Sequence, residues 1–220
     1  MKALVIGATG ATGKKLVQNL LKDDDYREVH IFARNPVAFS HEKLTVHCID
    51  FNRPEQWKHN VCGEVLFSCL GTTLKTAGSK AQQRKVDFDY QFHFAQAAKS
   101  NHVNHYVLVS SYGADARSSF FYPRMKGELE EAVVKLDFNQ TTIFRPGMLE
   151  RENSDRPAEV WGVKISKLFL RWGRLKAYRP LPVEQLAKAM INRSKQNQKG
   201  TAVVSLDEIL PLATAETSSY

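Results

Sequence analysis

The sequence predicts a doubly wound α/β fold, in which helices cover both faces of a parallel sheet. Short apolar runs alternate with segments of helical periodicity along most of the 220 residues, and parallel strands joined by helices produce that alternation. A turn with three glycines follows the first apolar run, which is typical of the first strand-to-helix connection in such folds. One domain accounts for the length, because α/β domains of more than 200 residues are common.

The elements follow in order from these patterns. Seven apolar runs are the predicted strands: Ala3–Ile6, Val29–Ala33, Leu44–Ile49, Val65–Leu70, Tyr106–Val109, Thr142–Phe144 and Ala202–Ser205. Five segments with apolar residues at helical spacing are the predicted helices: Thr12–Lys22, Val86–Lys99, Tyr122–Leu136, Ala158–Trp172 and Val183–Ser194. We expect one domain over residues 1–214 with a small C-terminal helical cap, a substrate cleft to which residues 148–195 contribute, and a flexible tail at 215–220.

An apolar stripe marks the fourth predicted helix. It consists of Trp161, Ile165, Leu168, Phe169 and Trp172, with basic residues largely elsewhere around the helix. We expect this stripe to pack on the domain and roof the substrate cleft. A membrane surface or a subunit interface is the alternative for a basic amphipathic helix.

Charge and composition narrow the class of protein. The formal net charge is +8, but the basic residues form no block and have no interleaved aromatic residues, so we expect no nucleic-acid partner. No apolar run approaches the ~20 residues of a membrane span, and the glycine turn begins too early to leave room for a leader, so a cytoplasmic protein without integral membrane association is expected. A monomer or a homodimer would fit.

The three cysteines, Cys48, Cys62 and Cys69, lack the spacing of a metal site. Apolar strand-like contexts around two of them predict buried thiols in a reducing compartment. No metal site is expected.

The glycine turn predicts a phosphate site. Gly7, Gly10 and Gly13 stand at three-residue spacing between an apolar strand and a helix. The first glycine would allow the tight turn, the second would let a pyrophosphate approach the backbone, and the third would let helix and strand pack closely. The helix N-terminus offers N–H groups to the anion. The whole turn is the predicted contact surface, including Thr9, Ala11 and Thr12.

The ends of the next two strands bear on the choice of cofactor. Arg34 follows the second strand about 20 residues after the glycines, where a carboxylate would bind the ribose 2′-hydroxyl of NAD and an arginine the 2′-phosphate of NADP. We therefore expect NADP(H), with NAD(H) as the weaker candidate; stacking of Arg34 on adenine without discrimination is the alternative. Asp50, after the third strand, is expected to bind the adenine amino group or, equally, to cap a helix over Asn52–Trp57.

Two further loops are predicted to contact the cofactor. Leu70, Gly71 and Thr72 follow the fourth strand, at the sheet edge where ligands bind in doubly wound folds. Pro146 and Gly147 follow the sixth strand, where the nicotinamide would lie. A turn without a ligand is the alternative for each loop.

Hydroxyl groups and a Tyr-x-x-x-Lys pair suggest the chemistry. Ser110 and Ser111 end the fifth strand, and Tyr122 and Lys126 lie one turn apart on the helix after it. An ammonium beside a phenol stabilises the phenolate and draws the phenol pKa of about 10 toward the working range. Ser111, with Ser110 as runner-up, would stabilise a developing oxyanion, and Lys126 could also hold the nicotinamide ribose. Tyr112, with no lysine four residues on, is the weaker candidate for the tyrosine.

These segments together carry a family resemblance. The quoted sequences are GATGATG at 7–13, CLGTT at 69–73, VDFDY at 86–90, SSYGAD at 110–115, YPRMKGE at 122–128 and FRPG at 144–147. They resemble the Tat-interacting oxidoreductase family of atypical short-chain dehydrogenases over nearly the whole chain. The resemblance implies a Rossmann domain, NADPH binding and a catalytic triad carried onto Ser111, Tyr122 and Lys126.

The combined prediction is an NADP(H)-dependent oxidoreductase that acts on a small carbonyl or alcohol. Tyr122 would be the general acid and base, Lys126 would lower its pKa, and Ser111 would polarise the substrate oxygen. A regulatory protein that senses the cofactor is one alternative, since the family is discussed as regulators as much as enzymes. Epimerase-like chemistry with the same triad is the other.

Overall fold

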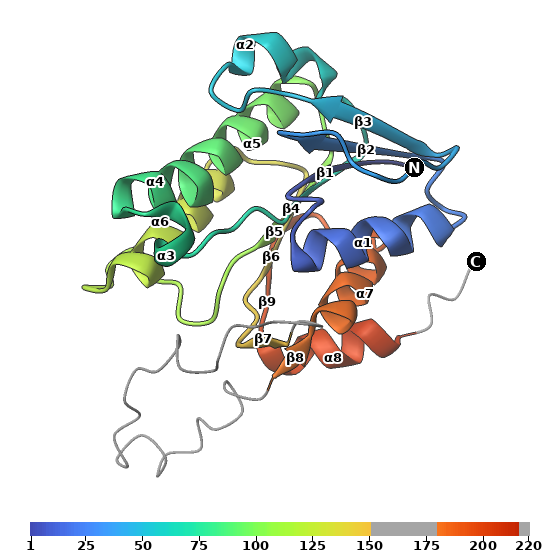
Figure 1. Cartoon of the computed structure of the whole chain (residues 1–220). Helices are drawn as coiled ribbons and strands as arrows, with labels where there is room; N and C mark the ends of the chain where they lie inside the picture. The colour runs from blue at the N-terminus through green and yellow to red at the C-terminus, as the bar shows by residue number, and fades with distance from the viewer. Residues whose placement is uncertain (151–179, 216–220) are drawn as a thin grey trace.

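The computed structural model describes residues 1–150 and 180–215. Its main feature is a seven-stranded parallel sheet in the order β3-β2-β1-β4-β5-β6-β9, with helices on both faces (Figure 1). The strands are β1 (Lys2–Ile6), β2 (Glu28–Ala33), β3 (Leu44–Cys48), β4 (Val65–Ser68), β5 (His105–Val109), β6 (Gln140–Phe144) and β9 (Gly200–Val204). The predicted fold class is confirmed, and each predicted strand is found with its ends shifted by at most two residues.

The helices alternate with these strands. The longer ones are α1 (Ala11–Lys22), α5 (Tyr90–Ser100), α6 (Phe121–Val134), α7 (Val183–Ser194) and α8 (Leu206–Thr214). Short turns of helix are α2 (Pro54–Trp57), the 3₁₀ turn η1 (Lys58–Asn60), α3 (Leu74–Ala77) and α4 (Lys80–Arg84), which runs through the π-helical turn η2 (Lys85–Asp89) into α5. The strands β7 (Leu149–Glu150) and β8 (Leu181–Pro182) form a separate parallel pair.

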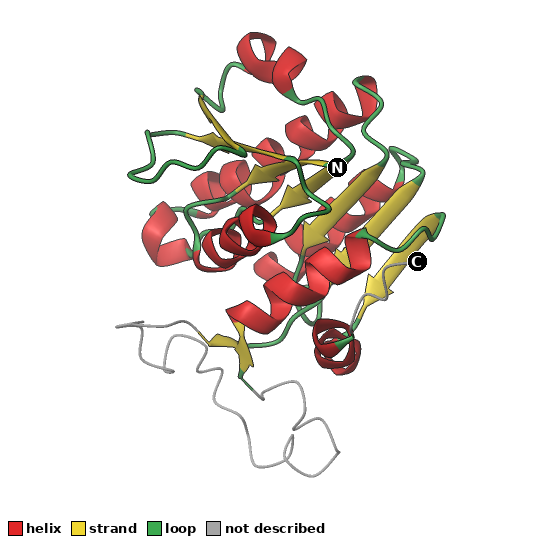
Figure 2. Cartoon of the chain, turned by 90° about the vertical axis from the view of Figure 1, so that its right-hand side faces the viewer, coloured by secondary structure: helices red, strands yellow, loops and turns green. Residues whose placement is uncertain are grey.

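Two apolar layers hold the helices on the sheet. Helices α1, α7 and α8 pack on one face of the sheet, and α5 and α6 pack on the other. Figure 2 shows helices on both sides of the strands. The central strand β1 contributes to both layers, because alternate residues of a strand point to opposite faces. Its four apolar residues, Ala3 to Ile6, are fully buried, as expected of a parallel strand covered on both sides.

The chain reverses direction across the sheet at β1. It runs from β1 outward to β2 and β3, then crosses back to β4, β5, β6 and β9. The carboxyl ends of β1 and β4 therefore border the crevice at which ligands bind in open α/β sheets. We call the edge formed by the carboxyl ends of the strands the carboxyl edge, and the opposite one the amino edge.

Several sequence expectations need correction. Cys48 and Cys62 are exposed instead of buried, because β3 is an edge strand and Cys62 lies in a loop. Asp50 does not cap α2, whose N-cap residue is Arg53. The helix α8 was not predicted. The predicted helix 158–172 with its stripe, and the tail from 216, lie outside the described residues, so the cleft assigned to 148–195 stays a prediction.

Candidate functional site

The glycine turn is shaped by backbone contacts at its two ends. Gly7 has a positive φ of 79°, and a Cβ there would lie 2.5 Å from the carbonyl carbon of Cys69. A Cβ on Gly13 would lie 2.1 Å from the Gly7 carbonyl oxygen. Both positions therefore require glycine for the fold itself.

Gly10 differs from the other two glycines. It is exposed, and a Cβ there would meet only the Gly7 oxygen, at 3.3 Å. Gly10 is also the N-cap of α1, and no side chain caps this helix. The turn thus presents bare backbone at a helix N-terminus, which suits an anion.

The loop after β4 is tied to the π-helical turn. The Thr72 backbone N–H donates to Asp87 Oδ2 at 2.9 Å, and the Gln83 side-chain amide donates to the Thr72 carbonyl at 3.4 Å. Asp87 is fully buried. Its other oxygen, Oδ1, has no hydrogen-bond partner among residues 1–150 and 180–215. Desolvation raises the pKa of Asp87 to about 6, against the opposing effects of Lys126 and the Thr72 N–H.

The two serines after β5 have different surroundings. Ser111 Oγ donates to the Tyr112 carbonyl at 3.0 Å. Ser110 Oγ is buried and has no hydrogen-bond partner in the described part of the chain. Tyr112 is half exposed, and its N–H donates to Pro146 O at 2.8 Å, which joins this loop to the one after β6. A buried hydroxyl without a partner is uncommon, so Ser110 is a candidate contact for a ligand.

Lys126 is the most unusual residue of the region. Its side chain is only 2% exposed, and its ammonium donates to the Val109 carbonyl at the end of β5, at 3.3 Å. Burial lowers the pKa of Lys126, while the charges of Asp87 and Glu130 act in the opposite direction. Tyr122 lies one turn before Lys126 on α6 and is partly exposed.

An ion pair braces α6 against the end of β6. Arg145 Nε donates to both carboxylate oxygens of Glu130, at 3.1 and 3.2 Å, and Arg145 Nη2 also donates to Glu130. Glu130 is 4% exposed. The Glu130 hydrogen bond raises the pKa of Arg145, so the guanidinium stays charged. The brace lies directly before Pro146 and Gly147.

The predicted residues fall on one edge of the sheet, in two groups. Residues 7–13, 70–72, 110–111 and 146–147 follow the carboxyl ends of β1, β4, β5 and β6, and Lys126 reaches the end of β5. Arg34 and Asp50 follow β2 and β3, beyond β1, and both are exposed. Asp50 accepts from the Asn52 backbone and side-chain N–H groups, both at 2.9 Å, which lowers its pKa.

Three residues of the region were missed by sequence reasoning: Asp87, Glu130 and Arg145. Asp87 could have been found from its spacing in the sequence. It continues, at helical spacing, the buried stripe of α5 formed by Gln91, Phe94 and Ala98. A carboxylate on an apolar helix stripe is rarely placed there for stability. Among the described residues, no group of three or more metal-binding side chains is found.

The sequence comparisons agree with this geometry. The family model described as NAD(P)H-binding matches residues 7–164. The protein HTATIP2 of Rattus norvegicus is 35% identical over 195 residues, covering 86% of this chain and 78% of the relative. The protein FMP52, named mitochondrial, of Debaryomyces hansenii is 32% identical over 208 residues, covering 89% and 88%.

Solved structures show the same fold at low sequence identity. MoeE5 in complex with UDP-glucose and NAD has a TM-score of 0.67 and 14% identity, over 97% of this chain and 81% of that chain. At this identity the likeness concerns the fold alone. No helix in the described part of the chain is long and apolar enough to cross a membrane.

Proposed function

Because the chain belongs to the NAD(P)H-binding family, with HTATIP2 and FMP52 proteins among its relatives, we propose that it is an NADP(H)-dependent oxidoreductase acting on a small carbonyl or alcohol. The cofactor would lie along the carboxyl edge, from Arg34 to Pro146. When bound, NADP(H) would supply or accept the hydride. The protein's own residues would bind it, orient the substrate and move the proton.

The carboxyl edge fits such a cofactor in three respects. The exposed backbone at Gly10 caps α1 without a side chain and suits a pyrophosphate. Two buried polar atoms, Ser110 Oγ and Asp87 Oδ1, have no hydrogen-bond partner among the described residues and could bond hydroxyl or amide groups of a ligand. Exposed Arg34 follows β2, where a guanidinium would pair with a 2′-phosphate and favour NADP(H) over NAD(H).

The proton chemistry is assigned to α6 and the end of β5. Tyr122 would give its phenolic proton to the substrate oxygen in reduction and take it back in oxidation. Lys126, with its ammonium held at Val109 O, would stabilise the phenolate and hold the ribose. Ser111 would donate to the substrate oxygen. Ser110 is the alternative, since the Ser110 hydroxyl has no hydrogen-bond partner where the structure describes the chain.

The observation that carries the proposal is the burial of Lys126. An ammonium that is 2% exposed costs several kcal/mol in desolvation unless it is fully paired. The fold could fill this position with an apolar side chain at no such cost. Groups placed against stability in a crevice are candidates for function.

A carbonyl panel followed by NADPH absorbance tests the proposal. Tyr122→Phe keeps the ring but loses the proton, so turnover should fall by roughly 10²–10⁴-fold while NADPH affinity stays within about twofold. Tyr112→Phe is the matched control, because this tyrosine is half exposed and ten residues earlier. Its turnover should equal that of the parent.

Equal turnover of Tyr122→Phe and the parent would contradict the assigned chemistry and favour the regulatory alternative, in which cofactor binding controls a partner. Epimerase-like chemistry would appear as conversion of a nucleotide sugar without net NADPH consumption.

The expected location remains cytoplasmic, although fungal relatives are named mitochondrial. Fractionation and sizing would test the location and the expected monomer or homodimer.

A further inference from the structure

Asp87 is a buried carboxylate whose hydrogen bonding within the described residues is incomplete. It lies in the π-helical turn η2, is 0% exposed, and continues the apolar stripe of α5. A buried carboxylate without full hydrogen bonding costs free energy. Turns of π-helix inside longer helices occur often at functional sites.

Both ends of the residue are held in place. Gln91 Nε2 donates to the Asp87 carbonyl at 2.7 Å, and Ser68 Oγ donates to Gln91 Oε1 at 2.7 Å. The carboxylate accepts from the Thr72 N–H through Oδ2. A Cβ on Gly71 would lie 3.6 Å from Oδ1. The carboxylate thus lies directly against the loop proposed to hold the cofactor.

The turn η2 packs against α6, and Asp87 and Lys126 are both buried there. The charges of Asp87 and of Glu130, which lies on α6 itself, both favour the charged form of Lys126. Glu130 is engaged by Arg145 through several hydrogen bonds, so its charge is compensated. Asp87 Oδ1 has no hydrogen-bond partner among the described residues. Of these two carboxylates, Asp87 is therefore the one whose charge is left to balance Lys126.

We propose that Asp87 is a positioning residue whose carboxylate keeps the buried Lys126 ammonium charged and fixes the cofactor loop at Thr72 to the same site. The proposal rests on the role given to Lys126 in the proposed function. It assigns Asp87 no contact with the reacting atoms. Its effect reaches the reaction through the charge of Lys126.

The test is an NMR titration of the Lys126 side chain in the full-length protein without cofactor. The signal is assigned by its loss in Lys126→Met. In Asp87→Asn the amide oxygen can still accept from Thr72 but the charge is gone, so the Lys126 midpoint should fall by about one pH unit or more. Asp89→Asn, a partly exposed neighbour in the same turn, should leave it unchanged. An unchanged midpoint in Asp87→Asn overturns the proposal.

A double variant covers the case in which Asp87→Asn does not fold. Removing one partner of a buried pair leaves an uncompensated charge, whereas removing both does not. Asp87→Asn combined with Lys126→Met should therefore recover folding, measured by thermal unfolding. A double variant as unstable as the single one would show a packing role and contradict the proposal.

Binding of NADPH separates the two proposals. If the wild-type protein fails to bind NADPH but the Lys126 midpoint falls in Asp87→Asn, the proposed function fails and the charge-holding role stands. If NADPH binds and the midpoint does not move, the proposed function stands and the role of Asp87 fails. Where both proposals hold, NADPH affinity should decline as the pH is raised and Lys126 loses its charge. In Asp87→Asn this decline should begin at a lower pH than in the parent.

Discussion

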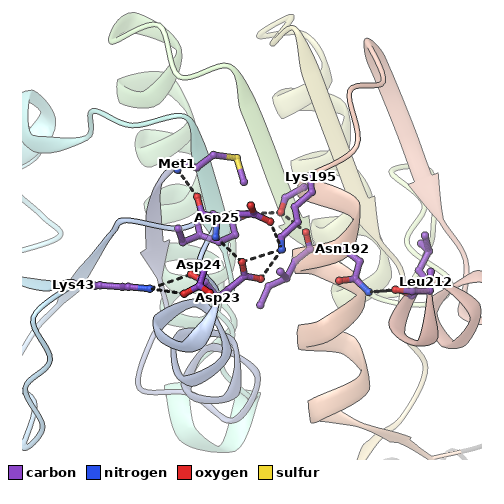
Figure 3. A network of polar contacts seen from close by, with 12 residues as sticks. Met1, Asp23, Asp24, Asp25, Lys43, Asn192, Lys195 and Leu212 are labelled. Atoms are coloured by element: carbon purple, nitrogen blue, oxygen red, sulfur yellow. Dashed lines mark hydrogen bonds and ion pairs between the residues drawn. The ribbon is translucent and has the colours of Figure 1, made fainter. Parts of the chain in front are cut away.

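Lys195 at the amino edge and Lys126 at the carboxyl edge have pKa values shifted in opposite directions. At the amino edge, Lys195 pairs with Asp23 at 2.7 Å and Asp25 at 2.6 Å (Figure 3). Although burial opposes it, the hydrogen bonds that Lys195 donates to both carboxylates raise its pKa. At the carboxyl edge, burial lowers the pKa of Lys126. Within the described residues, its ammonium donates to the Val109 carbonyl and forms no ion pair.

Hydrogen bonding of other polar atoms can be compared between the same two edges. Lys43 and the N-terminus of Met1 join the amino-edge network through the carbonyls of Asp23 and Asp25. Near the carboxyl edge, Ser110 Oγ and Asp87 Oδ1 are buried without a hydrogen-bond partner among the described residues. Buried atoms without such a partner also occur elsewhere in the described chain, including His93 Nδ1 on α5 and His105 Nδ1 at the amino edge. The position of Ser110 and Asp87 beside the proposed cofactor loops is what makes them candidate ligand contacts.

The largest effect is expected at the glycine turn. Gly13→Val would drive a side chain into the Gly7 carbonyl, so unfolding free energy should fall by about 4 kcal/mol or more. Gly10→Val meets far less resistance within the protein and should keep its fold while NADPH affinity falls on the order of 100-fold. Urea unfolding and fluorescence titration measure the two quantities. Normal NADPH binding by folded Gly10→Val would remove the phosphate site from this turn.

A buried histidine at the amino edge gives a pH-dependent prediction. Burial, aided by the charge of Arg193, lowers the pKa of His105 to about 4. A folded-state pKa below the unfolded value of about 6.5 means that stability is present above pH 6.5 and is lost as pH falls toward 4. About 2 kcal/mol should be lost between pH 7 and 5.

His105→Gln can still bond Thr142, the partner of His105 at 2.9 Å, and should lose that part of the acid sensitivity. Exposed His41→Gln is the control. The difference between variant and parent is the measured quantity, because Asp87, whose pKa is raised, acts with the opposite sign. An identical pH dependence in His105→Gln and the parent would contradict the assignment.

Cofactor choice compares the two ends of β2. NADPH should bind at least tenfold more tightly than NADH, about 1.4 kcal/mol, and Arg34→Ala should remove most of that preference. Arg27→Ala, an exposed arginine at the amino end of the same strand, should leave it intact. Equal affinities of the parent for NADPH and NADH would refute the role of Arg34.

The smallest effect is expected at Lys195. Lys195→Met removes partly exposed ion pairs, so unfolding free energy should fall by about 1 kcal/mol or less. NADPH affinity should stay unchanged. Weakened NADPH binding in Lys195→Met would contradict the assignment of stability to the amino edge and cofactor binding to the carboxyl edge.

Most of the sheet could be predicted from the sequence, because parallel strands buried on both faces are continuous apolar runs. The helix α8 was missed because Pro211 lies inside it. Its start was nevertheless readable in Ser205 and Glu208, whose carboxylate accepts from the Ser205 N–H at 2.7 Å. Burial of Cys48 was predicted wrongly, since a sequence does not show which strand ends at a sheet edge.

The predicted cofactor-binding and catalytic residues lie on one edge, because parallel strands all end there. The π-helical turn was predicted as part of a continuous helix over 86–99. Its geometry depends on contacts from Asp87 to Thr72 and Gln91, and tertiary contacts of this kind leave no periodic signal. The roles of Ser111, Tyr122 and Lys126 stay predictions.

An NMR titration with NADPH tests most directly whether the carboxyl edge is the cofactor site. Amide signals of Gly10, Thr72, Ser110 and Lys126 should shift in a saturable manner, with smaller changes for equimolar NADH. Signals of Asp25 and Lys195, at the amino edge, should stay in place. Shifts confined to the amino edge, or none at millimolar NADPH, would contradict the account.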